Sequence, residues 1–300
     1  MENITAKKKA LFIAIFLNII IVISQIIFGV LSHSIALITD AVHNFQDVVS
    51  LIIAYIAAIF VVKKPTEKMT FGYLRAEAMA GFINSAFLVG AIVLLIVMGI
   101  ERLIYPQSIE SLTVIIVGSI AFIVNSVSAF LLGFHHNHEN QHGHVHDEDL
   151  NIKAAYLHLL SDALISLGVV IGGIFMYFFQ IYWLDPVLSI IFSLYILKET
   201  VPVLKKTFGI LMEATPSEIN LTSIKDKIQK FPEIIEVHDI HIWALSSKDL
   251  YLTGHIVVDE KDLETVDLII KKIENSLRKE GINHITLQPE TMNFRCENIY

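Results

Sequence analysis

Apolar residues form long, nearly uncharged runs over the first two thirds of the chain and only short runs after that. A helix needs about 20 mostly apolar residues to cross the hydrocarbon core of a bilayer. Six runs reach this length, so the sequence predicts an α-helical membrane protein with six transmembrane helices. The predicted spans cover residues 10–30, 41–62, 78–100, 111–134, 154–179 and 186–204.

Beyond residue 216 the apolar positions alternate or recur along one stripe, as they do in soluble domains. Their α-β-β-α-β order predicts a small α+β domain. We therefore divide the chain into a membrane domain, residues 1–207, and a second domain, residues 208–300. The elements expected in the second domain are helices at 217–229 and 263–280 and strands at 235–245, 251–258 and 285–288.

Composition and charge agree with this division. Hydrophobic residues make up 54% of the chain and charged residues 17%, whereas soluble domains carry about 25% charged residues. Lysine and arginine concentrate before the first span and between the second and third, so the positive-inside rule places both termini in the cytoplasm. No basic stripe suits a nucleic acid, and the single Cys296 excludes an intrachain disulfide.

Two of the predicted spans carry the same pair of polar residues. His43 precedes Asp47 by four positions, and His158 precedes Asp162 by four, so each pair shares a helix face. A charged side chain in mid-span costs about 2.5–3.5 kcal/mol on insertion scales. Two imidazoles and two carboxylates provide the tetrahedral donor set that zinc accepts. The alternative is a His–Asp ion pair within each helix, but the repetition on two spans favours a shared metal site.

A third group of metal-binding side chains lies between the fourth and fifth spans. Six histidines fall within residues 135–146, and three acidic residues follow at 147–149. Such tracts bind metals by composition alone, and their lack of apolar residues predicts a mobile segment. Residues 135–149 are therefore expected to form a cytosolic loop that collects metal weakly. The alternative is a solvated linker that binds metal only because any cluster of histidines does.

Together with several short motifs, these features resemble the cation diffusion facilitator family, and specifically its zinc/cadmium/cobalt exporter subgroup. The resemblance covers nearly the whole chain. It implies a homodimeric, proton-coupled exporter of zinc, and of cadmium and cobalt, that works by alternating access in the cell membrane. It implies neither an enzyme nor a prosthetic group. The motifs are Ser34-Ile35-Ala36-Leu37 leading into Asp40, His43 and Asp47, the His158/Asp162 repeat, residues 71–77, Asp185-Pro186 and residues 237–243.

The resemblance also assigns individual residues. It implies that His43, Asp47, His158 and Asp162 are the transport ligands. Some family members carry a second metal site between spans two and three, but Met69 and Tyr73 replace its histidines here, so that site is not expected. The role of Asp40 remains open. It either supports the metal ligands or binds a proton beside them, or it is an ordinary carboxylate at a helix end.

For the tail, the resemblance implies a dimerising, metallochaperone-like domain with a regulatory zinc site at His238, His255 and Glu290. His241 is expected on the opposite strand face from His238, because residues three apart on a regular strand alternate. Roles for His241, His284 and Cys296 stay open. The family pattern further implies a charge pair between Arg75 and Glu213 that links the membrane and tail regions.

Three other functions are alternatives to export. A membrane-anchored metal sensor has no need of ligands in mid-membrane, and an intramembrane metalloenzyme needs an open coordination position that two His and two Asp would fill. A channel would not show saturable, pH-dependent exchange. The sequence does not rank zinc, cadmium and cobalt, and it gives neither the proton stoichiometry nor any role for potassium.

Overall fold

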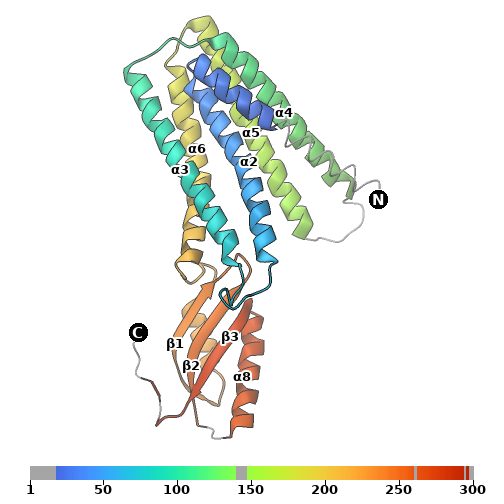
Figure 1. Cartoon of the computed structure of the whole chain (residues 1–300), viewed down its shortest axis with the longest axis vertical. Helices are drawn as coiled ribbons and strands as arrows, with labels where there is room; N and C mark the ends of the chain where they lie inside the picture. The colour runs from blue at the N-terminus through green and yellow to red at the C-terminus, as the bar shows by residue number, and fades with distance from the viewer. Residues whose placement is uncertain (1–17, 140–146, 260–261, 294, 297–300) are drawn as a thin grey trace. The chain divides into compact units, whose positions relative to one another are not determined.

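The computed structural model describes residues 18–139, 147–259, 262–293 and 295–296. Five of its helices are long and apolar enough to cross a membrane, and a shorter apolar helix, Asn18–Leu31, precedes them. This shorter helix is the described part of the first predicted span, whose earlier residues lie outside the described ranges. The five long helices are α2 (Ile35–Val61), α3 (Arg75–Ile104), α4 (Ser111–Glu139), α5 (Asp147–Phe179) and α6 (Leu184–Leu211) (Figure 1).

Helix α2 begins six residues before its predicted start, because a residue far away in the sequence caps it. The first backbone N–H groups of a helix have no partner within the helix. The carboxylate of Asp185, at the start of α6, accepts hydrogen bonds from the N–H of Ile35 at 2.7 Å and of Ala36 at 3.3 Å, and from the hydroxyl of Ser34 at 2.5 Å. Asp185 is fully buried, so this cap also fixes α2 to α6.

The segment predicted as an irregular loop, residues 135–149, is helical at both ends. Helix α4 continues to Glu139 and α5 already begins at Asp147. The prediction was wrong at these ends because apolar length marks where a helix crosses a bilayer, whereas the helix itself satisfies its backbone hydrogen bonds and can continue into water. Residues 140–146 of the histidine-rich tract lie outside the described part of the chain.

Helix α5 packs closely on two neighbours through adjacent glycines. A Cβ atom at Gly172 would overlap the Leu188 side chain on α6, and one at Gly173 would come within 2.9 Å of the Ile115 side chain on α4. Small residues at such positions let membrane helices approach closely. This close packing fixes the position of the helix that carries His158 and Asp162.

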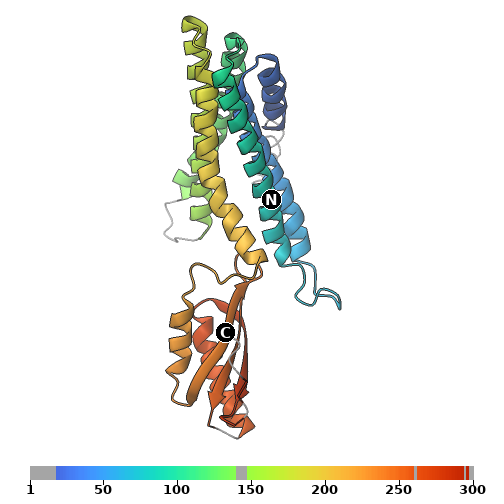
Figure 2. The ribbon, with the colours of Figure 1, turned by 90° about the vertical axis from the view of Figure 1, so that its left-hand side faces the viewer.

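The tail has the predicted α-β-β-α-β order. Strand β1 pairs antiparallel with β2, and β2 pairs parallel with β3. Apolar residues of both helices pack with one face of this sheet into a single core that includes Ile228, Leu252 and Ile273. The elements are α7 (Leu221–Gln229), β1 (Ile234–Ala244), β2 (Leu250–Val258), α8 (Leu263–Arg278) and β3 (Ile282–Glu290) (Figures 1 and 2).

A β-bulge in β1 changes which residues share a face of the sheet. His238 lies opposite His255, yet His241 lies opposite Thr253, so three steps along β1 match two steps along β2. Asp239, within the bulge, has a φ of 50°. Because of this extra residue, His238 and His241 both lie on the face away from α7 and α8. The expectation that they point to opposite faces was wrong, since it assumed a regular strand.

The chain divides into two compact units. One contains Met1–Ile52 and Asn84–Pro202, and the other contains Ile53–Ile83 and Val203–Tyr300. The four expected transport ligands all lie in the first unit, and the expected tail ligands all lie in the second. Each metal site is therefore described within its own unit.

Candidate metal sites

The doubled His–Asp pattern comes together between helices α2 and α5. The Nε2 atom of His43 lies 3.1 Å from Oδ1 of Asp162, and Nε2 of His158 lies 3.4 Å from Oδ1 of Asp47. The two imidazole rings meet edge to face, with centroids 5.8 Å apart. Ligand atoms of His43, His158 and Asp162 lie within 4.8 Å of one another, and Asp47 borders the group through His158.

The pairing runs between the helices rather than within them. Each histidine has its shortest carboxylate contact on the other helix, and the contact within α5, between His158 and Asp162, is longer at 3.8 Å. Ion pairs that only stabilise one helix would join residues four apart on that helix. The geometry instead brings His43, His158 and Asp162 together, with Asp47 beside His158, so that two nitrogen and two oxygen donors are available to a tetrahedral divalent ion.

The two cross-helix pairs differ in exposure. The side chains of His43 and Asp162 are 11% and 4% exposed, whereas those of His158 and Asp47 are 48% and 27% exposed. Asp47 lies after His43 along α2, and His158 lies before Asp162 along α5. The open pair therefore lies toward the C-terminal end of α2 and the N-terminal end of α5.

A buried carboxylate, Asp40, lies beside this site and was left open by the sequence. Its side chain is fully buried and accepts hydrogen bonds from Gln25, Asn44 and Ser166. Gln25 and Ser166 were not singled out in the sequence, because an uncharged polar residue in a membrane helix carries no pattern of its own. Only the packing of helix Asn18–Leu31, α2 and α5 brings them to Asp40.

The tail holds a second group of four ligand atoms, all within 4.8 Å of one another: those of His238, His255, Glu290 and Cys296. The Sγ atom of Cys296 lies 3.3 Å from Nε2 of His238 and 3.1 Å from Nδ1 of His255. The carboxylate of Glu290 lies 3.3 Å and 2.8 Å from the same two nitrogens. The structure thus brings together the three expected residues and adds Cys296.

The sheet and the segment after it position these four side chains. His238 and His255 are directly opposite each other on β1 and β2, and Glu290 ends β3, the parallel neighbour of β2. The backbone N–H of Cys296 donates to Glu290 at 3.0 Å. Arg295 donates to Glu236 of β1 at 2.7 Å, which holds the segment after β3 against the sheet.

The electrostatics of the tail group suit a metal ion. Burial opposes ionisation of Glu290, but hydrogen bonds from the Cys296 backbone and from His255 outweigh it and lower the pKa of this carboxyl. Desolvation and the neighbouring Glu290 carboxylate raise the pKa of the Cys296 thiol. Two nitrogens, one oxygen and one sulfur form a donor set that fits zinc, and an incoming dication would displace the thiol proton.

The other tail histidines stay outside this group. The Nε2 atom of His241 lies 3.0 Å from Asp239, and the ring of His284 lies 5.0 Å from the ring of Tyr251. The sequence left the roles of these two histidines open, and the structure does not bring them to the other four ligand atoms. The sequence also left Cys296 open, because a lone cysteine beyond the last strand gives no sign of which side chains it meets.

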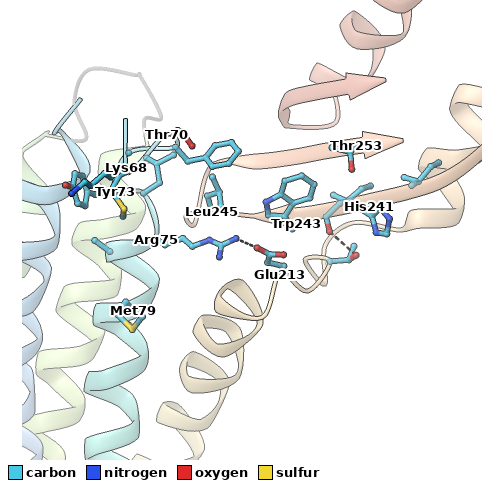
Figure 3. A pocket seen from close by; sticks show the side chains of 18 of the residues that line it. Lys68, Thr70, Tyr73, Arg75, Met79, Glu213, His241, Trp243, Leu245 and Thr253 are labelled. Atoms are coloured by element: carbon cyan, nitrogen blue, oxygen red, sulfur yellow. Dashed lines mark hydrogen bonds and ion pairs between the residues drawn. The ribbon is translucent and has the colours of Figure 1, made fainter. Parts of the chain in front are cut away.

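The expected charge pair is present. Nη2 of Arg75, the first residue of α3, lies 2.5 Å from Oε1 of Glu213, which follows α6. The side chains are 39% and 60% exposed. They line a cavity of about 1020 Å³ together with Met69 and Tyr73 (Figure 3).

Both parts of the chain match known protein families. Residues 11–212 match the cation efflux transmembrane domain, and residues 216–292 match the cation efflux protein cytoplasmic domain. The "Cadmium, cobalt and zinc/H(+)-K(+) antiporter" of Bacillus subtilis is 35% identical over 97% of this chain and 91% of its own length. The "Metal cation efflux system protein CzcD" of Cupriavidus metallidurans is 33% identical over 94% of this chain and 86% of its own.

More distant similarity extends to human proteins. The "Proton-coupled zinc antiporter SLC30A2" is 27% identical over 94% of this chain and 77% of its own length. Among solved structures, the metal-bound C-terminal domain of the CzcD transporter is 32% identical. That match covers 24% of this chain and 99% of the domain, with a TM-score of 0.22.

Proposed function

This chain belongs to the cation efflux, or cation diffusion facilitator, family, and we propose that it exports zinc from the cytosol in exchange for protons. Relatives that cover nearly all of the chain bear the names of cadmium, cobalt and zinc antiporters and of proton-coupled zinc antiporters. We extend the proposal to cadmium and cobalt as further substrates. The observation that carries the proposal of metal export is the His/Asp group between α2 and α5, in which each histidine contacts a carboxylate of the other helix.

The transport ligands in this proposal are His43, Asp47, His158 and Asp162. Metal ligands must be deprotonated, so a dication that enters the site displaces protons from the imidazoles. Imidazole is the side chain whose unperturbed protonation changes near neutral pH. When the metal leaves, each histidine regains a proton and donates to the carboxylate opposite. The same contacts thus hold α2 and α5 together in the metal-free state.

The exposure of the two pairs supports a direction of entry. With both termini in the cytoplasm, the C-terminal end of α2 and the N-terminal end of α5 face the cytosol. The open pair, His158 and Asp47, lies toward that side, and the buried pair lies beyond it. We therefore assign this conformation to the cytosol-facing step of an alternating-access cycle in the cell membrane.

The tail is assigned a regulatory role. In this proposal His238, His255 and Glu290, with Cys296, bind zinc as a regulatory ligand, and residues 208–300 mediate homodimer formation. The family that the tail matches is named ZT_dimer, and this name supports dimer formation through the tail. In the same proposal, residues 1–207 form the membrane domain. The protein acts as a transporter rather than an enzyme.

A cellular assay separates export from the alternative, a membrane-anchored metal sensor. We expect expression in cells that lack their own zinc exporters to lower cytosolic zinc and restore growth at toxic zinc concentrations. The Asp162→Asn variant should do neither, at equal abundance in the membrane. A sensor would leave cytosolic zinc unchanged in cells that express either the unmodified protein or the variant, and that result would overturn the proposal.

A further inference from the structure

Asp40 is a fully buried carboxylate whose partners come from three helices. Its Oδ2 atom accepts a hydrogen bond from Nε2 of Gln25 at 2.6 Å and one from Oγ of Ser166 at 2.9 Å. Its Oδ1 atom lies 3.4 Å from Nδ2 of Asn44. Gln25 lies on helix Asn18–Leu31 and Ser166 on α5, so Asp40 joins both to α2.

The partners of Asp40 can serve either protonation state of its carboxyl group. Gln25 and Asn44 each carry an amide with both a donor and an acceptor, and the Ser166 hydroxyl can donate or accept. A rotation of the amide turns a donor to the carboxylate into an acceptor from the carboxylic acid. The network around Asp40 can therefore offer partners to both the ionised and the neutral form.

The second fully buried carboxylate, Asp185, provides the contrast. Its partners include the backbone N–H groups of Ile35 and Ala36, which can only donate. Hydrogen bonds from groups that can only donate favour the ionised form of a carboxyl group over its neutral form. Asp185 thus meets two donors that cannot reverse their direction, whereas each partner of Asp40 can either donate or accept.

Among the described residues, no lysine or arginine side chain pairs with Asp40. None of the salt bridges among the described residues includes it, and the charged groups that act on it are His43 on its own helix and Asp162 on α5. Helix Asn18–Leu31 has no titratable side chain, and α4 contributes to the network only through Asn125, 3.5 Å from Ser166. A lone carboxylate inside a membrane domain is costly and favours protonation.

We propose that Asp40 is a proton-binding site distinct from the four metal ligands, and that it loses its proton when a divalent metal ion binds to them. The proposal rests on the proposed function, because it assumes that the His/Asp group binds the metal. Asp40 precedes His43 by three residues, a rise of about 4.5 Å along α2, and Ser166 follows Asp162 by one helical turn. The charge of a bound dication stabilises the Asp40 carboxylate, so the proton passes to water and is regained when the metal leaves.

Proton release on zinc binding tests this inference. The full-length protein is titrated with zinc by calorimetry between pH 5.5 and pH 8.5, in buffers of different ionisation enthalpy, so that the protons released per zinc ion are obtained. We expect Asp40→Asn to release about one proton fewer per zinc ion than the unmodified protein over part of this range. The tail site and the histidine-rich tract contribute equally to both proteins and cancel in the difference.

The control is Ser193→Ala, which removes a buried hydroxyl that forms no hydrogen bond among the described residues. It should release as many protons as the unmodified protein. Equal proton release from Asp40→Asn across the whole range, with zinc still bound, would overturn the proposal. Zinc binding that does not change in Asp162→Ala would instead contradict the proposed function, because the metal would then not occupy the His/Asp group.

A second variant keeps the test decisive if Asp40→Asn does not fold. Ser166→Ala removes one donor from the Asp40 carboxylate, so the carboxyl should keep its proton to higher pH. The midpoint of zinc-linked proton release should then move upward by about half a pH unit or more. An unchanged midpoint in Ser166→Ala would count against Asp40 as the proton site.

Discussion

His43 and Asp162 contact each other at 3.1 Å, although 119 residues separate them in the sequence. Their contact joins α2 to α5, and the contact between His158 and Asp47 repeats it in the opposite sense. Each helix thus contributes one donor and one acceptor to the other. A metal ion that binds all four side chains replaces these contacts without leaving any of them unpaired.

The ligand types predict a change in selectivity when one nitrogen donor is lost. Geometry and ligand type, rather than raw affinity, decide which metal a site prefers. Replacing His43 with Asp should relax discrimination toward cadmium, so that the cadmium-to-zinc flux ratio rises severalfold. His284→Asp, which changes a histidine outside both metal groups, is the control. A flux ratio that stays the same in His43→Asp would contradict the assignment.

Cys296 should strengthen metal binding in the tail, and more for cadmium than for zinc, because thiolate is a soft ligand. In a His43→Ala background, which disables the membrane site, Cys296→Ser should lower zinc affinity by about tenfold or more, and cadmium affinity further. Competition with a fluorescent chelator measures both. His284→Ala should leave both affinities unchanged. Equal affinities with and without the thiol would exclude Cys296 as a ligand.

In the His43→Ala background, the proteins with and without the Cys296 thiol should differ in how their zinc affinity depends on pH. The pKa of the Cys296 thiol is raised, so the thiol is protonated at neutral pH and each bound metal ion must displace that proton. The pKa of Glu290 is lowered, so its carboxylate is already ionised and adds no pH dependence near neutrality. Zinc affinity should therefore rise with pH between pH 6 and pH 8.5, with a steeper slope in the protein that retains Cys296. Identical slopes would show that the thiol does not take part.

These side-chain groups mark the limit of what the sequence predicts. The doubled His–Asp pattern predicted which side chains meet between α2 and α5, because the same spacing occurs on two spans. The start of α2 was missed because its cap, Asp185, lies 150 residues from Ile35. Cys296 gave no local sign of its contact with His238, which depends on how the segment after β3 returns to the sheet. Contacts of this kind depend on the packing of distant segments.

The bulge in β1 illustrates a different limit. The apolar pattern predicted the strand, but the pattern alone did not show the extra residue near Asp239. One inserted residue reverses the face of every side chain after it. The expected face of His241 was therefore wrong.

The histidine-rich tract should matter less than its composition suggests. Deleting residues 135–146 should lower the apparent zinc affinity of transport only about two- to threefold, because a tract of this composition acts as a weak collector. Initial zinc flux at low and high zinc concentrations measures the effect. Replacing the tract with Gly/Ser residues of equal length controls for the loss of chain length. Complete loss of transport at normal expression would show that the tract is essential.

The pair between Arg75 and Glu213 should contribute modestly to stability. Both side chains are more than one-third exposed, and exposed ion pairs contribute about 0–1 kcal/mol. A double-mutant cycle with Arg75→Ala and Glu213→Ala should give a coupling free energy of unfolding that is above zero but below about 1 kcal/mol. Exchanging the two charges should restore part of the stability that each single substitution loses. The exposed Lys271–Asp267 pair on α8 is the reference. Strict additivity would mean that the two charges act independently.

The central claim is that the four His/Asp ligands carry zinc across the membrane in exchange for protons. The most direct measurement is zinc uptake and simultaneous proton counterflow in proteoliposomes under an imposed pH gradient. We predict coupled fluxes for the unmodified protein and for Asp267→Ala, an exposed carboxylate outside both sites. Asp47→Ala and Asp162→Ala should abolish both fluxes, while each protein still inserts and dimerises. Near-normal zinc flux in both ligand variants would contradict the account.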